Sequence, residues 1–330
     1  MIPLPSLFVA RLFLFRRRSW RWVSALAVLI ALCVPVAAAA QDAKLLRIGF
    51  QKYGTLTILK ALGSLDKALA EQGIDVKWIE FPAGPQLLEG LNVGAIDFGT
   101  VGESPPIFAQ AAGAPLVYVG NEPPSPESEA ILVHKDSAIN SVADLKGKKV
   151  ALNKGSNVHY LLVKQLEKAG VPYKDVNVAY LTPADARAAF ERKAVDAWVI
   201  WDPFQAAAEH QLGARVLADG TGVVNNYQFF LASQDYASKY PQVIQTVLDE
   251  VYKGDLWARD HQSEAVDLLQ PVLGLDRPIV EVAARRMAYG VIPVTREVLQ
   301  HQQEIADAFY ALKLIPKKLD VFVGAPSNLK

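Results

Sequence analysis

Four short segments rich in small, polar and proline residues follow apolar runs and precede helical patterns. They read Gln51-Lys52-Tyr53-Gly54-Thr55, Gly99-Thr100-Val101-Gly102-Glu103-Ser104-Pro105, Lys154-Gly155-Ser156-Asn157 and Asp202-Pro203. In parallel α/β sheets, ligands bind outside the carboxyl ends of the strands, where helix N-termini offer unpaired N–H groups and the positive end of the helix dipole. The pattern therefore predicts a binding site for a small anion.

The segment around Ser156 is the strongest of these candidates. The Ser156 hydroxyl, the Asn157 amide and the first-turn N–H groups could all donate to an anion, and Gly155 lets a ligand approach the backbone. Taken alone, an ordinary Ser/Asn helix cap is the commoner explanation of such a segment. The phosphate-loop pattern G-x-x-x-x-G-K-[ST] is absent, so the segment does not indicate nucleotide hydrolysis.

The other junction residues add specific chemistry. Gln51 can donate and accept, and Lys52 could supply a positive charge, although an exposed lysine is commoner. Glu103 could contact the amine of a zwitterionic ligand or favour the start of a helix at Pro105. Trp201 ends its strand and suits an apolar wall, as does Tyr53.

The sequence allows more than one role for Trp198, His159 and Ser156. Trp198 lies three residues before Trp201 and so points to the opposite face of the strand, which favours a place in the core. The sequence leaves open whether His159 faces the cleft or solvent. A catalytic set of Ser156, His159 and Asp202 is conceivable, but no G-x-S-x-G elbow accompanies it. We therefore expect no catalytic residue.

Metal and cofactor sites find little support in the sequence. The five histidines are scattered without ligand spacing, and the chain has a single cysteine, Cys33. These counts exclude an internal disulfide framework and a cysteine-based metal cluster. We expect no metal and no cofactor.

Residues 1–40 differ from the rest of the chain. They contain five arginines, no lysine and no acidic residue, and an apolar run that ends in Ala38-Ala39-Ala40. This order is typical of a signal peptide cleaved near Ala40, with export to the periplasm. A membrane anchor is the alternative, and Pro35 and the small alanines argue against it. Arg16–Arg18 leaves open the twin-arginine or the general secretory route, and Leu32 before Cys33 argues against lipid attachment.

The charge balance changes once this segment is removed. The whole chain has 34 basic and 34 acidic residues, and without its five N-terminal arginines 29 basic residues remain against 34 acidic ones. Hydrophobic residues make up 51% of the chain, which excludes an intrinsically disordered protein. The lack of basic excess argues against a nucleic-acid binder. A mildly acidic protein must attract an anion through local donors.

Apolar and amphipathic segments alternate after Gln41, as in a largely parallel sheet covered by helices. Expected strands are 46–50, 75–81, 95–100, 115–120, 130–134, 149–153, 176–180, 196–201, 215–217 and 227–232. Expected helices are 55–72, 85–91, 105–112, 158–169, 183–192 and 203–212, with a short one at 141–144 and mostly helix after 237. The three prolines of 121–128 and the loop-like 220–226 interrupt this alternation. We expect one lobe from 41–128 and 228–330, a second from 129–227, and two crossings between them.

Several longer motifs resemble the aliphatic sulfonate-binding proteins of bacterial ABC importers. They are Glu80-Phe-Pro-Ala-Gly-Pro-Gln86, Pro105-Pro-Ile-Phe-Ala-Gln-Ala-Ala-Gly113, Leu181-Thr-Pro-Ala-Asp-Ala-Arg-Ala-Ala-Phe190, Val195-Asp-Ala-Trp-Val-Ile-Trp-Asp-Pro203 and Ile315-Pro-Lys-Lys-Leu-Asp320. The resemblance extends from about Leu46 to about Val321. It implies a type II periplasmic binding protein fold, two α/β lobes joined by two hinge strands that close over the ligand.

The same resemblance implies a function and a set of site residues. The protein would capture alkanesulfonates, as a monomer without a cofactor, and deliver them to a membrane permease and its ATPase subunit for sulfur acquisition. The resemblance implies a binding cleft at Gln51, Lys52, Gly99, Gly102, Glu103, Gly155, Ser156, Asn157, His159 and Trp201. Tyr53 and Asp202 are added because they lie in the strand-to-helix junctions. This chain departs from the family pattern at two positions. The family more often has Asp where this chain has Glu103, and its stretch around Asn157 is richer in Ser.

Three alternatives stay open beside the sulfonate. Relatives on the same scaffold bind taurine, nitrate or thiamine precursors. A desulfinase of similar fold uses a cysteine nucleophile, for which this chain offers only Cys33. A sensor domain would carry an output segment, and none is visible.

Overall fold

The computed structural model describes residues 45–327 and 329. The predicted signal peptide at residues 1–40 and Cys33 lie outside these residues. Two five-stranded sheets organise the described chain. None of the described helices has the length and apolar character needed to cross a membrane.

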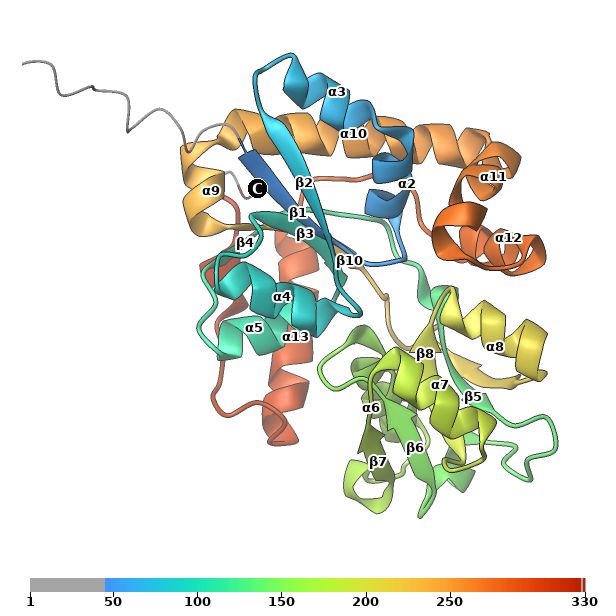
Figure 1. The fold of residues 1–330 in the computed structure, drawn as a ribbon. Helices are drawn as coiled ribbons and strands as arrows, with labels where there is room; N and C mark the ends of the chain where they lie inside the picture. The colour runs from blue at the N-terminus through green and yellow to red at the C-terminus, as the bar shows by residue number, and fades with distance from the viewer. Residues whose placement is uncertain (1–44, 328, 330) are drawn as a thin grey trace, which may run out of the picture. The chain divides into compact units, whose positions relative to one another are not determined.

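The first sheet has the strand order β2-β1-β3-β10-β4. Its strands are β1 (Leu45–Phe50), β2 (Asp75–Glu80), β3 (Phe98–Gly102), β4 (Leu116–Asn121) and β10 (Gln228–Ser233). One face is covered by α2 (Thr55–Leu62), α3 (Ser64–Ala70) and α10 (Pro241–Asp260), whose buried side chains pack on Leu46 and Ile48. The opposite face is covered by α4 (Gly84–Asn92), α5 (Pro105–Ala111) and α13 (Arg296–Ala311) (Figure 1).

The second sheet has the order β7-β6-β8-β5-β9. Its strands are β5 (Glu129–Val133), β6 (Lys149–Leu152), β7 (Asn177–Tyr180), β8 (Ala197–Trp201) and β9 (Arg215–Asp219). It is covered by α6 (Asn157–Lys168), α7 (Pro183–Glu191) and α8 (Phe204–Leu212). β5 and β8 are buried along their whole length because helices cover both faces, which explains the apolar sequences of β8 and of β5 after Glu129.

The chain passes between the sheets twice, and this decides the direction of two strands. After β4 it enters the second sheet as β5, which runs antiparallel to β8 and β9. It returns as β10, which runs antiparallel to β3 and β4. The expectation of largely parallel sheets is therefore right for β1, β2, β3 and for β6, β7, β8, and wrong for the two crossing strands.

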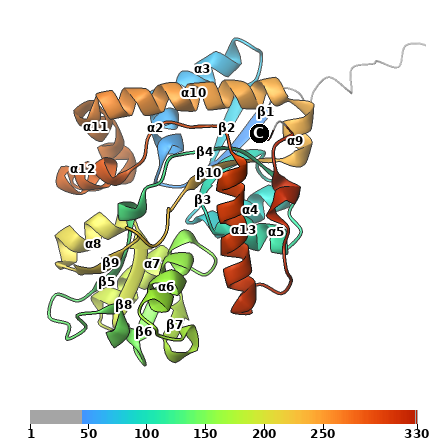
Figure 2. The same ribbon diagram turned by 180° about the vertical axis from the view of Figure 1, so that it is seen from behind.

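The end of the chain packs against the first sheet. α9 (Gln234–Lys239), α11 (Gln262–Leu273) and α12 (Arg277–Arg286) complete the predicted helical region, with α13 as its last long helix. Figure 2 shows α13 passing beside α5 and α6. Phe309 on α13 contacts both neighbours, with ring centroids 5.0 Å from Phe108 of α5 and 5.3 Å from His159 of α6.

Two boundaries differ from the sequence prediction. The helix predicted over 55–72 is broken into α2 and α3 at Gly63, whose φ of 67° is left-handed and ends the first helix. The strand predicted at 95–100 lies at Phe98–Gly102, where it pairs with β10. As a result Gly99 and Gly102 both lie inside the strand.

Candidate functional site

A polar cavity lies between the two sheets, where strands β1, β3 and β8 end. It is small and is lined by Gln51, Tyr53, Gly84, Gly102, Pro105, Ser156, Asn157, Trp201 and Gln228. Six of these are site residues that the sequence predicts: Gln51, Tyr53, Gly102, Ser156, Asn157 and Trp201. The walls of the cavity therefore come from segments of both sheets.

Helix beginnings supply part of the cavity wall. Gly84 is the first residue of α4, Pro105 of α5 and Asn157 of α6. The first N–H groups of a helix have no partner within it, so Gly84 and Gln86 of α4 and Asn157 and Val158 of α6 supply backbone donors at these helix starts, while Pro85 has no N–H and His159 N donates to Ser156 O at 3.0 Å. α5 offers fewer, because Pro105 and Pro106 have no N–H and Ile107 N donates to Ser104 O at 3.0 Å.

Two side chains on the wall have free donors. Gln228 and Trp201 both line the cavity, and neither the Gln228 amide nor the Trp201 indole N–H has a hydrogen-bond partner among residues 45–327 and 329. Gln228 is the first residue of β10 and pairs with Gly102, so its side chain lies beside a residue without one. Gln51 is partly occupied, since its Nε2 donates to Thr100 O at 3.2 Å. These uncharged donors suit an anion.

The predicted donors Ser156 and Asn157 line the cavity, but their side-chain protons are directed elsewhere. Ser156 Oγ donates to Asn153 O at 2.7 Å. Asn157 Nδ2 donates to Glu129 Oε2 at 2.6 Å and to Asn226 Oδ1 at 3.0 Å. A hydroxyl has one proton and an amide nitrogen two, so both are fully used. What this segment still offers an anion is the backbone of α6.

The two sheets meet closely at two glycines. A Cβ at Gly102 would lie 2.9 Å from the Cβ of Asn157, so any side chain would separate β3 from α6. Gly155 has a φ of 76°, and a Cβ there would lie 3.1 Å from the Phe108 ring of α5. Gly155 therefore does not line the cavity but allows α5 and the loop before α6 to touch.

Two buried carboxyl groups lie just behind the cavity. Burial raises the pKa of Glu103 to about 8, although Glu103 Oε2 accepts from Tyr227 N at 3.1 Å. Burial also raises the pKa of Glu129 well above its usual value, and the nearby Glu103 adds to this. Both groups are thus held in the uncharged form near neutral pH, in which they do not repel an anion.

Asp202 stands at the contact between the sheets. It is buried, and its Oδ1 accepts from Ala206 N at 3.0 Å. Arg286 of α12 lies 3.4 Å from Asp202 Oδ2 and 2.9 Å from Glu209 Oε2 of α8. Burial raises the pKa of Asp202 to about 6, and Arg286 opposes that rise. Asp202 therefore joins the segments around the cavity rather than lining it.

Three other predicted residues do not line the polar cavity. Gly99 packs under Leu87, whose Cδ2 would be 2.7 Å from a Cβ. Lys52 is exposed, with Nζ 3.7 Å from Glu80 Oε1. His159 is buried, and its Nδ1 accepts from Gly155 N at 3.2 Å, so the proton is on Nε2, which donates to Tyr173 Oη at 2.8 Å. Burial lowers the pKa of His159 to about 3, so this imidazole is neutral.

Sequence reasoning missed three of the lining residues. Gly84 lies in Pro82-Ala83-Gly84-Pro85, a small-residue junction after a strand like the four that were singled out. Pro105 was noted only as a helix start. Gln228 had one signal, a polar residue at the start of the apolar strand 227–232, but it lies far from the other segments in sequence. Among the described residues, no group of three or more His, Cys, Asp or Glu could hold a metal ion.

Two mixed sheets joined by two crossings, with a donor-lined cavity between them, define a periplasmic binding protein fold of type II. The chain belongs to the NMT1/THI5 like family, whose model matches residues 69–265. The family resemblance noted in the sequence is confirmed by its relatives.

Three matches, one by sequence and two to solved structures, cover most of the chain. A protein of Escherichia coli (strain K12) named as an aliphatic sulfonates-binding protein is 47% identical over 299 residues, which cover 90% of this chain and 93% of that protein. The alkanesulfonate-binding protein SsuA from Xanthomonas axonopodis pv. citri, solved bound to MOPS, is 42% identical with a TM-score of 0.82, covering 86% of this chain and 98% of that one. The periplasmic aliphatic sulphonate binding protein SsuA from Escherichia coli is 46% identical with a TM-score of 0.78, covering 87% and 94%.

Proposed function

We propose that this chain is the substrate-binding protein of an ABC importer and captures alkanesulfonates in the polar cavity for sulfur acquisition. The observation that carries the proposal is a wall of uncharged donors, above all the free groups of Gln228 and Trp201. The relatives from Escherichia coli and Xanthomonas, which are sulfonate binders by name, support it. We propose binding without catalysis.

The chemistry of the ligand matches this wall. A sulfonate is a permanent monoanion with three acceptor oxygens and no proton to give, so it needs several donors and neither a metal nor a base. Neutral donors bind the sulfonate through hydrogen bonds alone. They add no positive charge, which would attract other anions equally. The carboxyl groups of Glu103 and Glu129 do not oppose the ligand while their raised pKa values keep them protonated.

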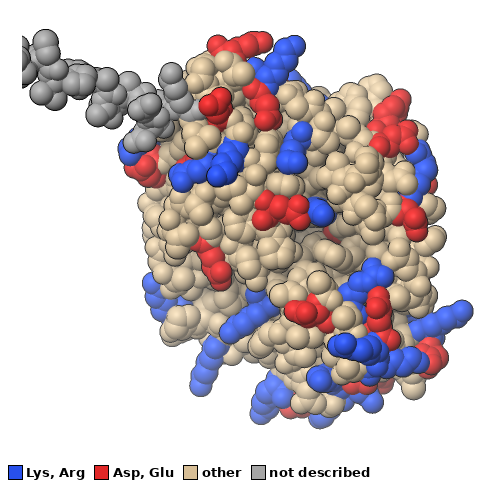
Figure 3. Space-filling view, viewed as in Figure 1, with Lys and Arg blue, Asp and Glu red and all other residues tan. Residues whose placement is uncertain are grey.

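The cellular setting is part of the same proposal. Residues 1–40 direct export and are removed near Ala40, and the monomer works in the periplasm. The lobes 41–128 with 228–330 and 129–227 close over the ligand at the two crossings. The closed form then docks on a permease driven by an ATPase subunit. Lys and Arg are interspersed with Asp and Glu among the uncharged residues on the face in Figure 3, so attraction of the anion falls to the cavity.

Calorimetry with hexanesulfonate, hexanoate, taurine and nitrate tests the ligand class. We expect strong binding of the sulfonate and binding at least tenfold weaker of the carboxylate, which has two acceptor oxygens in a plane. Equal affinity for hexanesulfonate and hexanoate would contradict the sulfonate proposal. Tighter binding of nitrate than of any sulfonate would reassign the cavity to a smaller anion.

A further inference from the structure

One buried residue, Asn226, holds the two crossings to each other. It lies in the second crossing, and its Nδ2 donates to Ser125 O of the first crossing at 2.9 Å and to Ser128 Oγ at 3.0 Å. The Ser125 hydroxyl donates back to Asn226 O at 3.2 Å, and Ser125 N donates to Asn225 O at 3.0 Å. The two segments that connect the sheets are therefore joined at Asn226.

The backbone of Asn226 has an unusual conformation. Its φ of 51° is left-handed, and among the described residues other than glycine only Lys193 and Lys313 share such a φ. Both lysines are exposed, whereas Asn226 is buried. The left-handed region is unfavourable for residues with a side chain, although Asn tolerates it better than most. The hydrogen bonds of Asn226 hold it there, and positions held in this way cluster at functional sites.

A third side-chain hydrogen bond of Asn226 crosses between the two sheets. Asn226 lies two residues before β10, and Tyr227 N donates to Glu103 Oε2 after β3 at 3.1 Å, so this end of the crossing is fixed to the first sheet. Asn157 begins α6, which packs on β5 and β8 of the second sheet. Asn157 Nδ2 donates to Asn226 Oδ1 at 3.0 Å. We call this hydrogen bond the inter-sheet contact.

The partners of Asn226 fix the orientation of both amides. Ser125 O is a carbonyl and can only accept, so Asn226 turns its Nδ2 towards Ser125 and its Oδ1 towards α6. Oδ1 can also only accept, so Asn157 presents its Nδ2, which in addition donates to Glu129 Oε2 at 2.6 Å. An ionised aspartate at position 226 would lack the donor for Ser125 O. The pairing therefore depends on an amide at this position.

The inter-sheet contact lies at the wall of the polar cavity. Asn157 lines this cavity beside Gly102, and a Cβ at Gly102 would lie only 2.9 Å from the Cβ of Asn157. Asn226 Oδ1 is within hydrogen-bond distance of α6 because the first sheet and α6 approach each other this closely. Separation of the two sheets would therefore break the inter-sheet contact.

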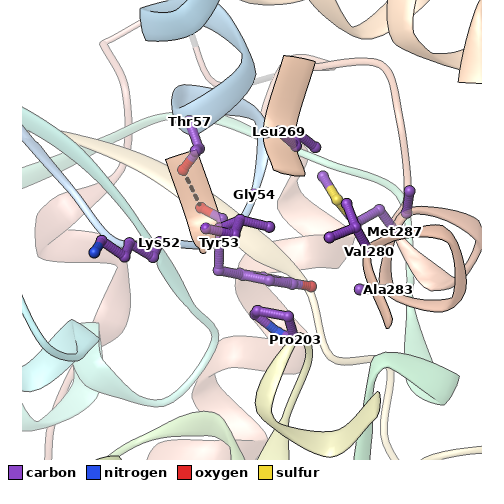
Figure 4. Close-up of a pocket in the computed structure, with 11 residues that line it drawn as sticks. Lys52, Tyr53, Gly54, Thr57, Pro203, Leu269, Val280, Ala283 and Met287 are labelled. Atoms are coloured by element: carbon purple, nitrogen blue, oxygen red, sulfur yellow. Dashed lines mark hydrogen bonds between the residues drawn. The ribbon is translucent and has the colours of Figure 1, made fainter. Parts of the chain in front are cut away.

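A second wall residue, Tyr53, is joined to the same hydrogen bonds. Its hydroxyl donates to Ser128 Oγ at 3.2 Å, and Ser128 Oγ also accepts from Asn226. Figure 4 shows the Tyr53 ring above Pro203, which follows β8 of the second sheet, and the hydrogen bond from Thr57 to the Tyr53 backbone. Asn226 is thus connected to cavity walls that come from both sheets.

We propose that Asn226 is a positioning residue of the sulfonate site, which joins the two crossings and, through Asn157, keeps the two sheets closed on the bound ligand. The inference rests on the proposed function and names the residue that retains the ligand. Because the inter-sheet contact forms only when the sheets are together, it acts after the ligand has entered. Its loss should therefore speed dissociation and leave association almost unchanged.

Stopped-flow tryptophan fluorescence with hexanesulfonate measures both rate constants, since Trp201 lines the cavity. Asn226→Gly keeps the left-handed backbone and removes the side-chain hydrogen bonds. We expect it to release hexanesulfonate at least fivefold faster than the wild type, with association within twofold. Lys313→Gly is the matched control, because Lys313 has a φ of 58° and is exposed. It should release the ligand at the wild-type rate.

The outcomes separate this inference from the proposed function. Failure of the wild type to bind hexanesulfonate would overturn both. Unchanged dissociation in Asn226→Gly, or an equal change in Lys313→Gly, would overturn the inference alone. A merely structural role would lower the melting temperature and the calorimetric stoichiometry without changing the dissociation rate. If Asn226→Gly does not fold, Asn157→Ala decides the question. It removes the inter-sheet contact and leaves the bonds between the crossings, and dissociation at the wild-type rate would overturn the inference.

Discussion

At the scale of single residues, recognition of the anion depends on which donors remain unused. Ser156 and Asn157 look like donors in the sequence, yet their side chains are committed to Asn153, Glu129 and Asn226. Gln228 and Trp201 keep free N–H groups on the wall of the cavity. The difference arises because a buried polar group takes the partners nearest to it as the chain folds.

Removal of the free donors should weaken sulfonate binding. For Gln228→Leu and for Trp201→Phe we expect a loss of about 1.5–3 kcal/mol each, the usual value of a hydrogen bond to a charged partner. Trp201→Phe keeps an aromatic wall and removes only the N–H. The matched control is Trp198→Phe, because Trp198 lies in the core beside Phe190. Titration calorimetry measures the affinities, and a Trp201→Phe variant that binds like the wild type would exclude the indole N–H from the site.

Glu103 should make stability depend on pH. Its pKa is raised by burial to about 8, whereas in the unfolded chain it is about 4.3. The folded state therefore holds a proton that the unfolded state loses, so the contribution of Glu103 to stability is complete below pH 4 and is lost as pH rises towards 8. The loss is on the order of 1 kcal/mol per pH unit over that range. In Glu103→Gln we expect the melting temperature to vary less between pH 5 and pH 8 than in the wild type.

The same ionisation should act on the ligand. A sulfonate stays charged at every pH in this range, so any pH dependence of its binding comes from the protein. Above pH 8 the ionised Glu103 adds a negative charge behind the cavity, and affinity should fall. Glu103→Gln should lose less affinity than the wild type between pH 6.5 and pH 9, with the remaining loss due to Glu129, and equal losses in the two proteins would contradict this account.

At the scale of elements, glycines decide how closely α5 and α6 approach. Gly155 and Gly63 both have left-handed φ angles, 76° and 67°. Gly155 faces the Phe108 ring, while nothing lies within 4 Å of a Cβ at Gly63. Both positions require a left-handed backbone, but only Gly155 also contacts a neighbouring element, through Phe108 of α5.

This pair gives a matched test of the contact. Gly155→Ala and Gly63→Ala should each lose about 1–2 kcal/mol of folding stability from the left-handed backbone. Only Gly155→Ala also pushes α5 away from the loop before α6, so only this variant should bind sulfonate more weakly, by at least threefold. Thermal unfolding and calorimetry provide the two measurements. Equal affinities in both variants would mean that the Phe108 contact does not matter for the bound form.

At the scale of the whole described chain, α8 and α12 hold the two sheets together beside the cavity. Ala206 and Ala207 of α8 pack on Ile279 of α12. Arg286 adds its contacts to Asp202 and Glu209. The apolar contact is non-directional, whereas the ion pairs fix the relative position of the two helices.

Loss of Arg286 should weaken both stability and binding. Arg286→Ala leaves Asp202 buried without its cation, and we expect a loss of about 1–3 kcal/mol of folding stability together with weaker sulfonate binding. Arg285→Ala is the control, since Arg285 is exposed on the same helix. A variant at 286 that melts and binds like the variant at 285 would show that the ion pairs contribute nothing to either property.

Much of the fold could be predicted from the sequence. The alternation of strands and helices, the two crossings near 121–135 and 220–232 and the family resemblance are local or sequential signals, and the fold class is confirmed by the matches to SsuA structures. The helix break at Gly63 and the antiparallel strands β5 and β10 were missed. The break had a local signal, a glycine that can end a helix in the left-handed conformation, whereas the direction of β5 and β10 depends on how distant segments pair.

The sequence by itself determined that small polar junctions end the strands, and that they would gather at one place. Only the tertiary structure decided which of their side chains face the cavity and which donors stay free. Gly99 and Gly102 lie on one strand, yet Gly99 packs under Leu87 and Gly102 meets Asn157. Gln228 reaches the site because β10 pairs with β3. Strand register and competition for buried partners are properties of the packed molecule, and no single segment of sequence contains them.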